Sequence, residues 1–246
     1  LLELYRNCCC ANQVAHPNTI AGGEDNCRLC HDGKGYQYFR LLSLIDSMPQ
    51  TIHPTKARLI ETAAELLDSA LPEAIQVDEI LDKSGISKGS LYHHFEDLGE
   101  LLEAAQVARY ANWVDRSIGL IVPLLSSAKS RDDIINGLRK ATLYTQSSEY
   151  KSTRFARARA LANSETSDRF RKALGLEQER LTTALEDLVD EAKNKGLFRA
   201  EINSRVVAVF IQSYTLGKIV DDVVPTPMEQ EKWDDFIYKH ACATMR

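Results

Sequence analysis

The chain has 246 residues, of which 44% are hydrophobic and 26% charged, and its 30 Lys and Arg against 35 Asp and Glu give a formal net charge of −5. These proportions are typical of a globular protein of one or two domains and exclude fibrous and disordered chains. The longest apolar run, residues 118–125, contains Gly119 and Pro123 and is far shorter than the roughly 20 residues of a membrane-spanning helix. We therefore expect no membrane association.

Five of the six cysteines lie within the first 30 residues, at Cys8, Cys9, Cys10, Cys27 and Cys30. Residues 27–31 read Cys-Arg-Leu-Cys-His, the CxxCH pattern of covalent haem attachment, in which the histidine ligates the iron. The same thiolates and the His31 imidazole could instead bind zinc. A metal- or haem-linked redox protein is therefore the alternative function.

A haem site of this type requires export, but the N-terminus has no basic segment followed by an apolar core and a cleavage site. Three adjacent cysteines are also poor geometry for one tetrahedral zinc ion. Met48 lies just before the first amphipathic segment, so we expect the true start there and interpret residues 1–47 as upstream read-through or a disordered extension. Only Cys242 then remains, which suits a reducing cytoplasm, and we expect no metal and no cofactor.

From Met48 onward the apolar residues follow a helical period, and no run of alternating strands occurs. The apolar residues between positions 59 and 70 form one stripe of a first helix, which Pro72 ends. A short second helix begins near Val77 and ends at Gly85, and Ser87 can cap a third helix over about residues 88–95.

Longer helices are expected over residues 101–121, 130–147, 153–162, 181–192, 205–220 and 227–243. In the last of these, Thr226 and Glu229 form a capping-box pattern with Pro227 at the first helical position. The sequence therefore predicts an all-α protein of about nine helices, with a small domain of three short helices before a larger helical domain.

Residues 77–95 read as a short helix, a glycine turn and a second helix whose first turn carries small and basic residues. A helix-turn-helix needs such an arrangement, because the second helix must present a slim end to the major groove of DNA. Gly89 and Ser90 keep this end narrow, while Ile80 and Leu91 can pack the pair against the first helix. The pattern favours a DNA-binding head.

The chain resembles the TetR/AcrR (tetracycline-repressor-like) family of bacterial transcriptional regulators. The resemblance rests on the run Gly85-Ile86-Ser87-Lys88-Gly89-Ser90-Leu91-Tyr92-His93-His94-Phe95, with Arg58, Ala63-Ala64 and Leu66-Leu67 upstream and Glu100-Leu101-Leu102 downstream. It implies a cytoplasmic homodimeric repressor whose recognition helix, residues 87–95, binds palindromic double-stranded operator DNA. A small-molecule effector of unknown identity in the C-terminal domain would release the DNA.

The resemblance also implies two domains. The helix-turn-helix domain would cover residues 52–112, with the motif itself at about residues 75–94, and a helical ligand-binding and dimerisation domain would cover residues 113–246. By position in the motif, the candidate DNA-binding residues are Arg58, Gln76, Val77, Ser87, Lys88, Gly89, Ser90, Tyr92, His93 and His94. Helix capping by Ser87, a solvated Lys88 and packing of one histidine are the ordinary roles of these side chains.

The head departs from the family pattern in two ways. Leu71 stands where the family usually has a glycine, and Ile75-Gln76 replaces a hydroxyl pair. Residues 53–99 also contain only four basic residues against nine acidic ones. Because non-specific affinity comes largely from neutralised phosphates, we expect weak non-specific binding with a shallow salt dependence. A helical adaptor whose head no longer binds DNA is a third interpretation.

Aromatic side chains with one polar end suit amphipathic ligands, although core packing is their commoner role. The candidate ligand-binding residues are Tyr110, Trp113, Tyr144, Phe155 and Arg154. The basic segment of residues 151–172 is a solvated face, a set of partners for acids on other helices, or a site for an anionic ligand.

The last two expected helices carry apolar stripes that would form a symmetric interface, with Ala208 and Gly217 allowing close approach. The candidate dimerisation residues are Val207, Phe210, Ile211, Tyr214, Trp233, Phe236 and Ile237. The chain contains no HExxH, Walker A, GxSxG or GxGxxG motif, so we expect no enzymatic activity.

Overall fold

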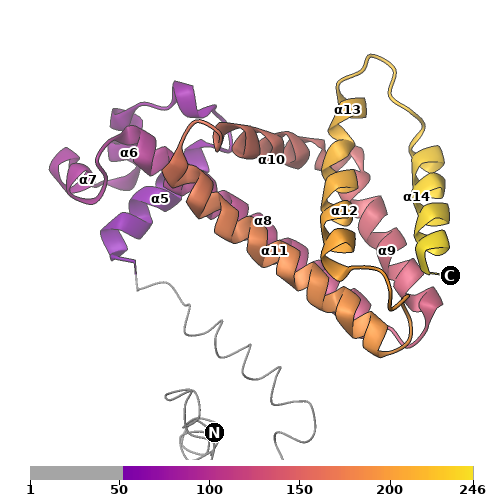
Figure 1. Ribbon diagram of the computed structural model, residues 1–246. Helices are drawn as coiled ribbons and strands as arrows, with labels where there is room; N and C mark the ends of the chain where they lie inside the picture. The colour runs from indigo at the N-terminus through magenta and orange to yellow at the C-terminus, as the bar shows by residue number, and fades with distance from the viewer. Residues whose placement is uncertain (1–51, 246) are drawn as a thin grey trace, which may run out of the picture. The chain divides into compact units, whose positions relative to one another are not determined.

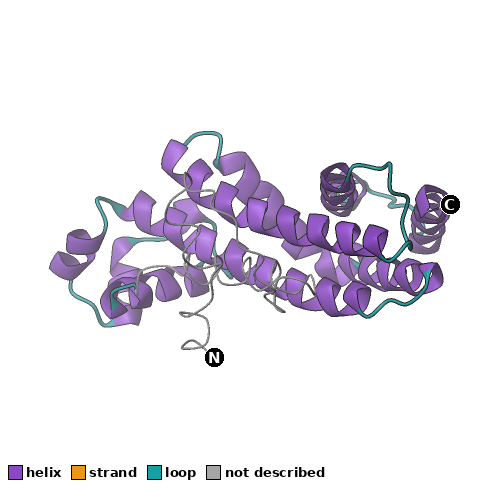
Figure 2. Ribbon diagram, turned by 60° about the horizontal axis from the view of Figure 1, so that its bottom comes forward, coloured by secondary structure: helices purple, strands orange, loops and turns teal. Residues whose placement is uncertain are grey.

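The computed structural model describes residues 52–245, apart from the side chains of Leu124 and residues 241–245. In this part of the chain every regular element is helical (Figures 1 and 2), with nine α-helices of seven or more residues, the single turn α13 (Ile219–Asp222) and two short 3₁₀ helices. The predicted fold class and helix number are confirmed. The cysteine cluster of residues 1–47 and the expected start at Met48 lie outside the described residues. No described helix is both long and apolar enough to cross a membrane.

Three short helices, α5 (Pro54–Leu66), α6 (Val77–Ser84) and α7 (Lys88–His94), form the head. Gly85 ends α6 in the left-handed conformation (φ 71°), and the Ser87 hydroxyl accepts the Ser90 N–H at 3.3 Å at the start of α7. Both ends were predicted, since a left-handed glycine and a serine cap are local signals.

The first helix ends at Leu66, four residues earlier than the apolar stripe suggested. The N–H groups of Ser69 and Ala70 bond to the Leu66 carbonyl in a turn, and the chain is extended at Leu71. Pro72 explains the extended residue, because a proline disfavours the helical conformation of the residue before it. The proline then opens the 3₁₀ helix η1 (Pro72–Ala74).

The head has its own core, which includes the first turns of the long helix α8 (Leu98–Ser126). Its buried members are Leu59, Ala63, Leu67, Ile75, Ile80, Leu91, Phe95, Leu101, Leu102 and Ala105. Because α8 continues from this core into the larger helical part, one helix joins the head to the rest of the described residues.

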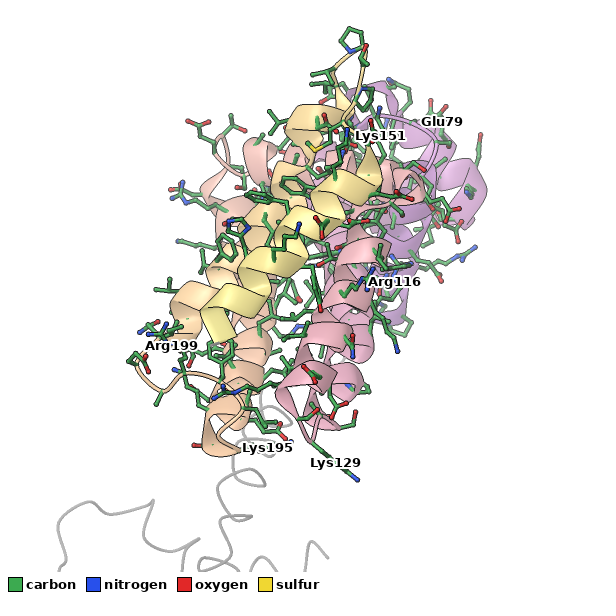
Figure 3. The ribbon with its side chains drawn as sticks, turned by 90° about the vertical axis from the view of Figure 1, so that its right-hand side faces the viewer. Glu79, Arg116, Lys129, Lys151, Lys195 and Arg199 are labelled. Atoms are coloured by element: carbon green, nitrogen blue, oxygen red, sulfur yellow. The ribbon has the colours of Figure 1, made fainter. Side chains whose placement is uncertain are left out.

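In the larger part, α8 and α11 (Asp168–Asn194) run along each other (Figure 1), and α12 (Ser204–Gly217) packs on α11. The helix α9 (Arg131–Gln146) contacts α8 and also supports α14 (Gln230–Met245). Figure 3 shows α14 in front, with α12 and α9 on its two sides. The shorter helix α10 (Lys151–Asn163) touches α8 and α12.

Two expected helix starts are wrong. The helix α11 begins at Asp168, not near residue 181, and its buried stripe of Phe170, Leu174 and Leu181 is interrupted only by the polar Gln178. The last helix begins at Gln230, so the expected capping box at Thr226 to Glu229 does not form. The Asp221 carboxylate accepts the Met228 N–H at 3.0 Å, which holds this segment as a loop.

Three other helices differ from the expectation at their ends. The helix α8 continues through Pro123 to Ser126, and α10 extends the expected 153–162 helix on both sides. The expected 205–220 helix is divided, because α12 ends at Gly217 and α13 follows as a separate turn.

Candidate nucleic-acid interface and effector site

The recognition helix α7 has one anchored face and one free face. Leu91 is fully buried in the head core, whereas Lys88 and His93 are exposed and the Tyr92 side chain is 44% exposed. A Cβ added to Gly89 would meet nothing within 4 Å, so packing inside the protein does not require glycine there. The first turn of α7 is therefore slim and open, as a helix that enters a DNA groove must be.

The start of α6 carries two further candidates of the motif, Gln76 and Val77, which differ in their exposure. The Glu79 carboxylate accepts the Gln76 N–H at 3.1 Å, which caps the helix without a hydroxyl residue. Gln76 is exposed, while Val77 is half-buried and packs against the head core. Of these two candidates, Gln76 can reach a partner outside the protein and Val77 positions the helix.

Histidine rings gather at the end of α7. The His94 ring centroid lies 4.9 Å from that of His53 and 5.1 Å from that of His93. Partial burial, followed by the nearby charges of His53, His93 and Lys56, lowers the pKa of His94 below its ordinary value of 6.5. His94 is therefore a neutral imidazole near pH 7, which can form hydrogen bonds but does not add positive charge to the head.

Ion pairs neutralise half of the basic residues of the head. Arg58 contacts Glu61 at 3.0 Å, and Lys83 contacts Glu65 at 3.1 Å. Among the described residues no ion pair holds Lys88, and Lys56 lies over the Phe95 ring, with Nζ 4.9 Å from the centroid. Lys88 is therefore the unpaired cation that the recognition helix presents to solvent.

The candidate ligand-binding residues fall into different environments. Tyr110 and Trp113 lie together in the core with ring centroids 5.3 Å apart, whereas Tyr144 is 56% exposed. Arg154 is 1% exposed, and its guanidinium donates to both Asp222 carboxylate oxygens at 2.6 and 2.8 Å. Arg154 thus joins α10 to α13, and Phe155 beside it is half-buried.

Polar residues that the sequence reasoning missed surround Tyr110 and Trp113. The Tyr110 hydroxyl donates to Gln178 at 2.5 Å, and Gln178 donates in turn to Gln212 on α12. The Trp113 indole N–H donates to the Tyr150 hydroxyl at 2.6 Å. A signal for this cluster existed, because Gln178 and Gln212 each lie four residues after a buried apolar residue, at a position where the stripe predicts another one.

Arg157 also belongs to this cluster: it is 5% exposed, and its guanidinium carbon lies 3.7 Å from the centroid of the Trp113 ring. Burial lowers the pKa of Arg157 below the ordinary value of an arginine. Sequence reasoning included Arg157 only as one residue of the basic segment, because the sequence does not show which arginine of an arginine-rich helix lies inside.

The candidate dimerisation residues point in two directions. Phe210 is 59% exposed and Phe236 is 52% exposed. Val207 and Ile211 pack inward against core clusters. The remaining three are partly buried: Ile237, Tyr214, whose hydroxyl bonds to Thr142 at 2.9 Å, and Trp233, whose indole donates to Gln146 at 3.1 Å. The exposed apolar stripe of α12 consists of Val206, Val209 and Phe210. Each of these positions lies one residue before a position of the predicted stripe, which contained Val207, Phe210 and Ile211.

Residues 59–105 match the sequence family described as bacterial regulatory proteins, tetR family. The matched segment contains most of α5, both helices of the motif and the first turns of α8. No curated protein matches the chain in sequence.

Solved structures resemble the whole helical part. Salmonella enterica GusR aligns with a TM-score of 0.58 and 16% identity, over 80% of this chain and 98% of its own. A TetR-family regulator from Mesorhizobium loti aligns with a TM-score of 0.57 and 16% identity, over 77% of this chain and 94% of its own. A TetR-family regulator from Rhodococcus sp. aligns with a TM-score of 0.55 and 18% identity, over 78% of this chain and 98% of its own. The chain therefore carries the N-terminal domain of the TetR family of bacterial regulatory proteins, on a fold that it shares with solved TetR-family structures.

Proposed function

We propose that this protein is a cytoplasmic transcriptional repressor that binds a palindromic DNA operator as a homodimer and responds to a small molecule bound among the helices of residues 113–246. The observation that carries the proposal is the free face of α7. Lys88, Tyr92 and His93 are exposed there, while Leu91 on the opposite face anchors the helix in the head core. This is the arrangement in which a recognition helix contacts base edges and phosphates.

Each side chain of this face has a role that follows from its chemistry. Lys88, which forms no ion pair with another residue of the described range 52–245, would contact a phosphate or the acceptor edge of a guanine. The Tyr92 hydroxyl would donate to a phosphate, and His93 would contact a base edge or a phosphate. Ser87 caps α7 with its hydroxyl, and the exposed first-turn N–H groups of that helix favour an anion such as phosphate.

A homodimer is supported by apolar side chains that the chain itself leaves uncovered. Val206, Val209 and Phe210 on α12 are between 48% and 64% exposed, and Phe236 on α14 is 52% exposed. Two copies related by a two-fold axis would cover the same stripe on each other. Two heads related by this axis would read two inverted half-sites, which is the reason for proposing a palindrome.

The test is an electrophoretic mobility shift with the full chain and the duplex DNA that flanks its own gene. Lys88→Ala is compared with Lys83→Ala, which removes the same charge from the head but at a residue paired with Glu65. We expect Lys88→Ala to weaken binding at least about tenfold and Lys83→Ala to change it little, since only Lys88 lies on the recognition helix.

Tyr92→Ala should also weaken binding, and unlabelled DNA of unrelated sequence should compete poorly. Equal losses in Lys88→Ala and Lys83→Ala would contradict the proposed contact surface. Binding that unrelated DNA removes as well as the flanking DNA would contradict an operator and would favour the adaptor interpretation.

A further inference from the structure

Arg157 is a buried cation without a counter-charge in the described part of the protein. Its side chain is 5% exposed, its Nε atom has no hydrogen-bond partner, and no carboxylate of residues 52–245 forms an ion pair with it. Its charged form interacts instead with the Trp113 ring and with the phenols of Tyr110 and Tyr150. A cation in such a place is costly, because it has lost water and gained no ion pair.

Arg154, three residues earlier on the same helix, shows how this chain stabilises an arginine that has a structural role. Arg154 is also buried, but Asp222 accepts two of its hydrogen bonds, and the carbonyls of Thr145 and Ser147 accept two more at 2.8 and 3.1 Å. The environment of Arg157 lacks each of these elements. An arginine kept for packing alone would not need its charge.

The neighbouring phenols cannot supply the missing negative charge. Burial raises the pKa of Tyr110 and of Tyr150 above the ordinary value of 10.0, so both hydroxyls stay protonated near pH 7. The Tyr150 hydroxyl, which accepts the Trp113 indole N–H, can donate a hydrogen bond to an anion, whereas the Tyr110 hydroxyl already donates to Gln178. The cluster therefore offers one cation, one neutral donor and three aromatic rings.

We propose that Arg157 is the anion-binding residue of the effector site, and that the effector is an organic monocarboxylate whose apolar part lies among Tyr110, Trp113 and Tyr150. The Trp113 ring covers the face of the guanidinium at 3.7 Å, so an anion must approach the edge, which carries the Nε–H that has no partner among the described residues. One buried cation balances one negative charge, and the aromatic rings favour an apolar body over a phosphate. A regulatory role of the bound anion rests on the proposed function, whereas the anion site itself does not.

The aromatic cluster reaches the surface through Tyr150. The Tyr150 ring lies 5.1 Å from that of Tyr144, which is 56% exposed. Tyr150 ends the short 3₁₀ helix η2 (Ser148–Tyr150) between α9 and α10. We place the entry of the ligand there, because a shift of this single turn opens the cluster without moving a long helix.

The same cluster is connected to both functional surfaces. Tyr110 and Trp113 belong to α8, whose first turns carry Leu101 and Leu102 of the head core. From Tyr110, hydrogen bonds lead through Gln178 to Gln212 on α12, the helix with the exposed apolar stripe. A carboxylate bound to Arg157 among these side chains would therefore act on α8, whose first turns belong to the core that holds the recognition helix.

The test measures ligand binding to the full chain without DNA, by thermal unfolding and by the fluorescence of Trp113 in a Trp233→Phe background. The probes are benzoate, phenylacetate and hexanoate, each with its neutral amide at the same concentration. Arg157→Met removes the charge, and Arg159→Met is the matched control, since Arg159 is exposed on the same helix. Circular dichroism shows whether each variant keeps its helices.

We expect at least one carboxylate to bind with a Kd below about 1 mM, its amide to bind at least about tenfold more weakly, and Arg157→Met to lose the preference for the acid. Arg159→Met should bind like the unaltered chain. The proposal is overturned if no carboxylate binds, if acid and amide bind equally, or if Arg157→Met keeps the preference. If Arg157→Met loses its helices, Arg157→Lys decides, because it keeps the charge without the planar fork and should bind the acids more weakly than the unaltered chain.

The outcome is separable from that of the proposed function. A chain that binds carboxylates through Arg157 but does not shift DNA contradicts the repressor and supports the anion site. A chain that shifts its operator but binds none of the acids overturns the anion site alone.

Discussion

At the residue scale, the contact between Arg154 and Asp222 joins parts of the chain that are 68 positions apart. Both side chains are under 10% exposed, and Lys151 donates to the Asp222 carbonyl at 2.5 Å. The pair thus holds α13 and the end of α9 against α10.

We predict that Asp222→Leu lowers the free energy of unfolding by about 3–5 kcal/mol, because it leaves the Arg154 guanidinium buried without a counter-charge. The double variant Arg154→Met with Asp222→Leu should recover most of this loss. Urea unfolding followed by circular dichroism measures both. Arg154→Met alone completes the comparison. If the loss of stability in the double variant equalled the sum of the losses in the two single variants, the two side chains would not be coupled, which would contradict the ion pair.

The pKa of His94 makes a second prediction at this scale. Partial burial and the positive neighbours lower this pKa below 6.5, so the unfolded chain binds the proton more tightly than the folded one. The contribution of His94 to stability is therefore complete above about pH 6.5 and is lost as the pH falls toward the folded pKa. Carboxylates with a lowered pKa, such as Glu179 and Asp221, change the stability only when the pH falls below about their ordinary pKa values of 4.5 and 3.8.

The unfolding temperature should accordingly fall between about pH 7.5 and about pH 5.5, and His94→Asn should reduce this fall. His240→Asn is the control, since this histidine is exposed on α14, outside the head. An identical pH dependence in the His94 variant and the unaltered chain would contradict the assignment.

Single residues also show what could be predicted from sequence. The left-handed Gly85 and the Ser87 cap are set by their immediate neighbours, and both were predicted. The partner of Arg154 and the isolation of Arg157 depend on contacts between helices distant in sequence, which no local pattern contains. Sequence reasoning therefore identified the candidate recognition helix but not the inner polar cluster.

At the scale of elements, the positions of most helices were predicted, and the errors lie at their ends. The early start of α11 was missed because Gln178 and Gly175 weaken its apolar stripe. The start of α14 was misplaced because Asp221, from an earlier segment, takes the N–H of Met228. Helix interiors follow local periodicity, whereas the start of a helix depends on which group accepts the free N–H groups of its first turn.

The exposed stripe of α12 leads to the third prediction. Phe210→Glu should convert the proposed dimer into a monomer at micromolar concentration, because a charge would be buried against its symmetry mate. Leu176→Glu is the control, since it places the same charge at a residue that is 74% exposed on α11. Sedimentation or light scattering gives the mass. A monomeric unaltered chain, or a dimeric Phe210→Glu, would contradict the interface.

At the scale of the whole molecule, the net charge of −5 is unfavourable for DNA binding, and the head contributes to this with nine acidic residues in positions 53–99. Ion pairs with Glu61 and Glu65 hold two of its four basic residues, which leaves Lys56 and Lys88. Specific contacts, and the pairing of two heads in a dimer, must then supply most of the affinity.

We predict a shallow salt dependence of binding to the operator. Two or three phosphates neutralised by each head of a dimer give a slope of log K against log salt of about −4 to −5. Fluorescence anisotropy over a series of salt concentrations measures it. A slope near −10, as for proteins with many phosphate contacts, would show a basic surface that residues 52–245 do not contain.

The central claim is that α7 reads DNA as one half of a symmetric pair. Repeated selection of binding sequences from a random duplex library, with the full chain, tests this claim most directly. We predict enrichment of an inverted repeat whose half-sites lie about one helical turn apart or a multiple of it, and loss of that enrichment in Lys88→Ala but not in Lys83→Ala. Recovery of no inverted repeat, or the same repeat with Lys88→Ala at equal affinity, would contradict it.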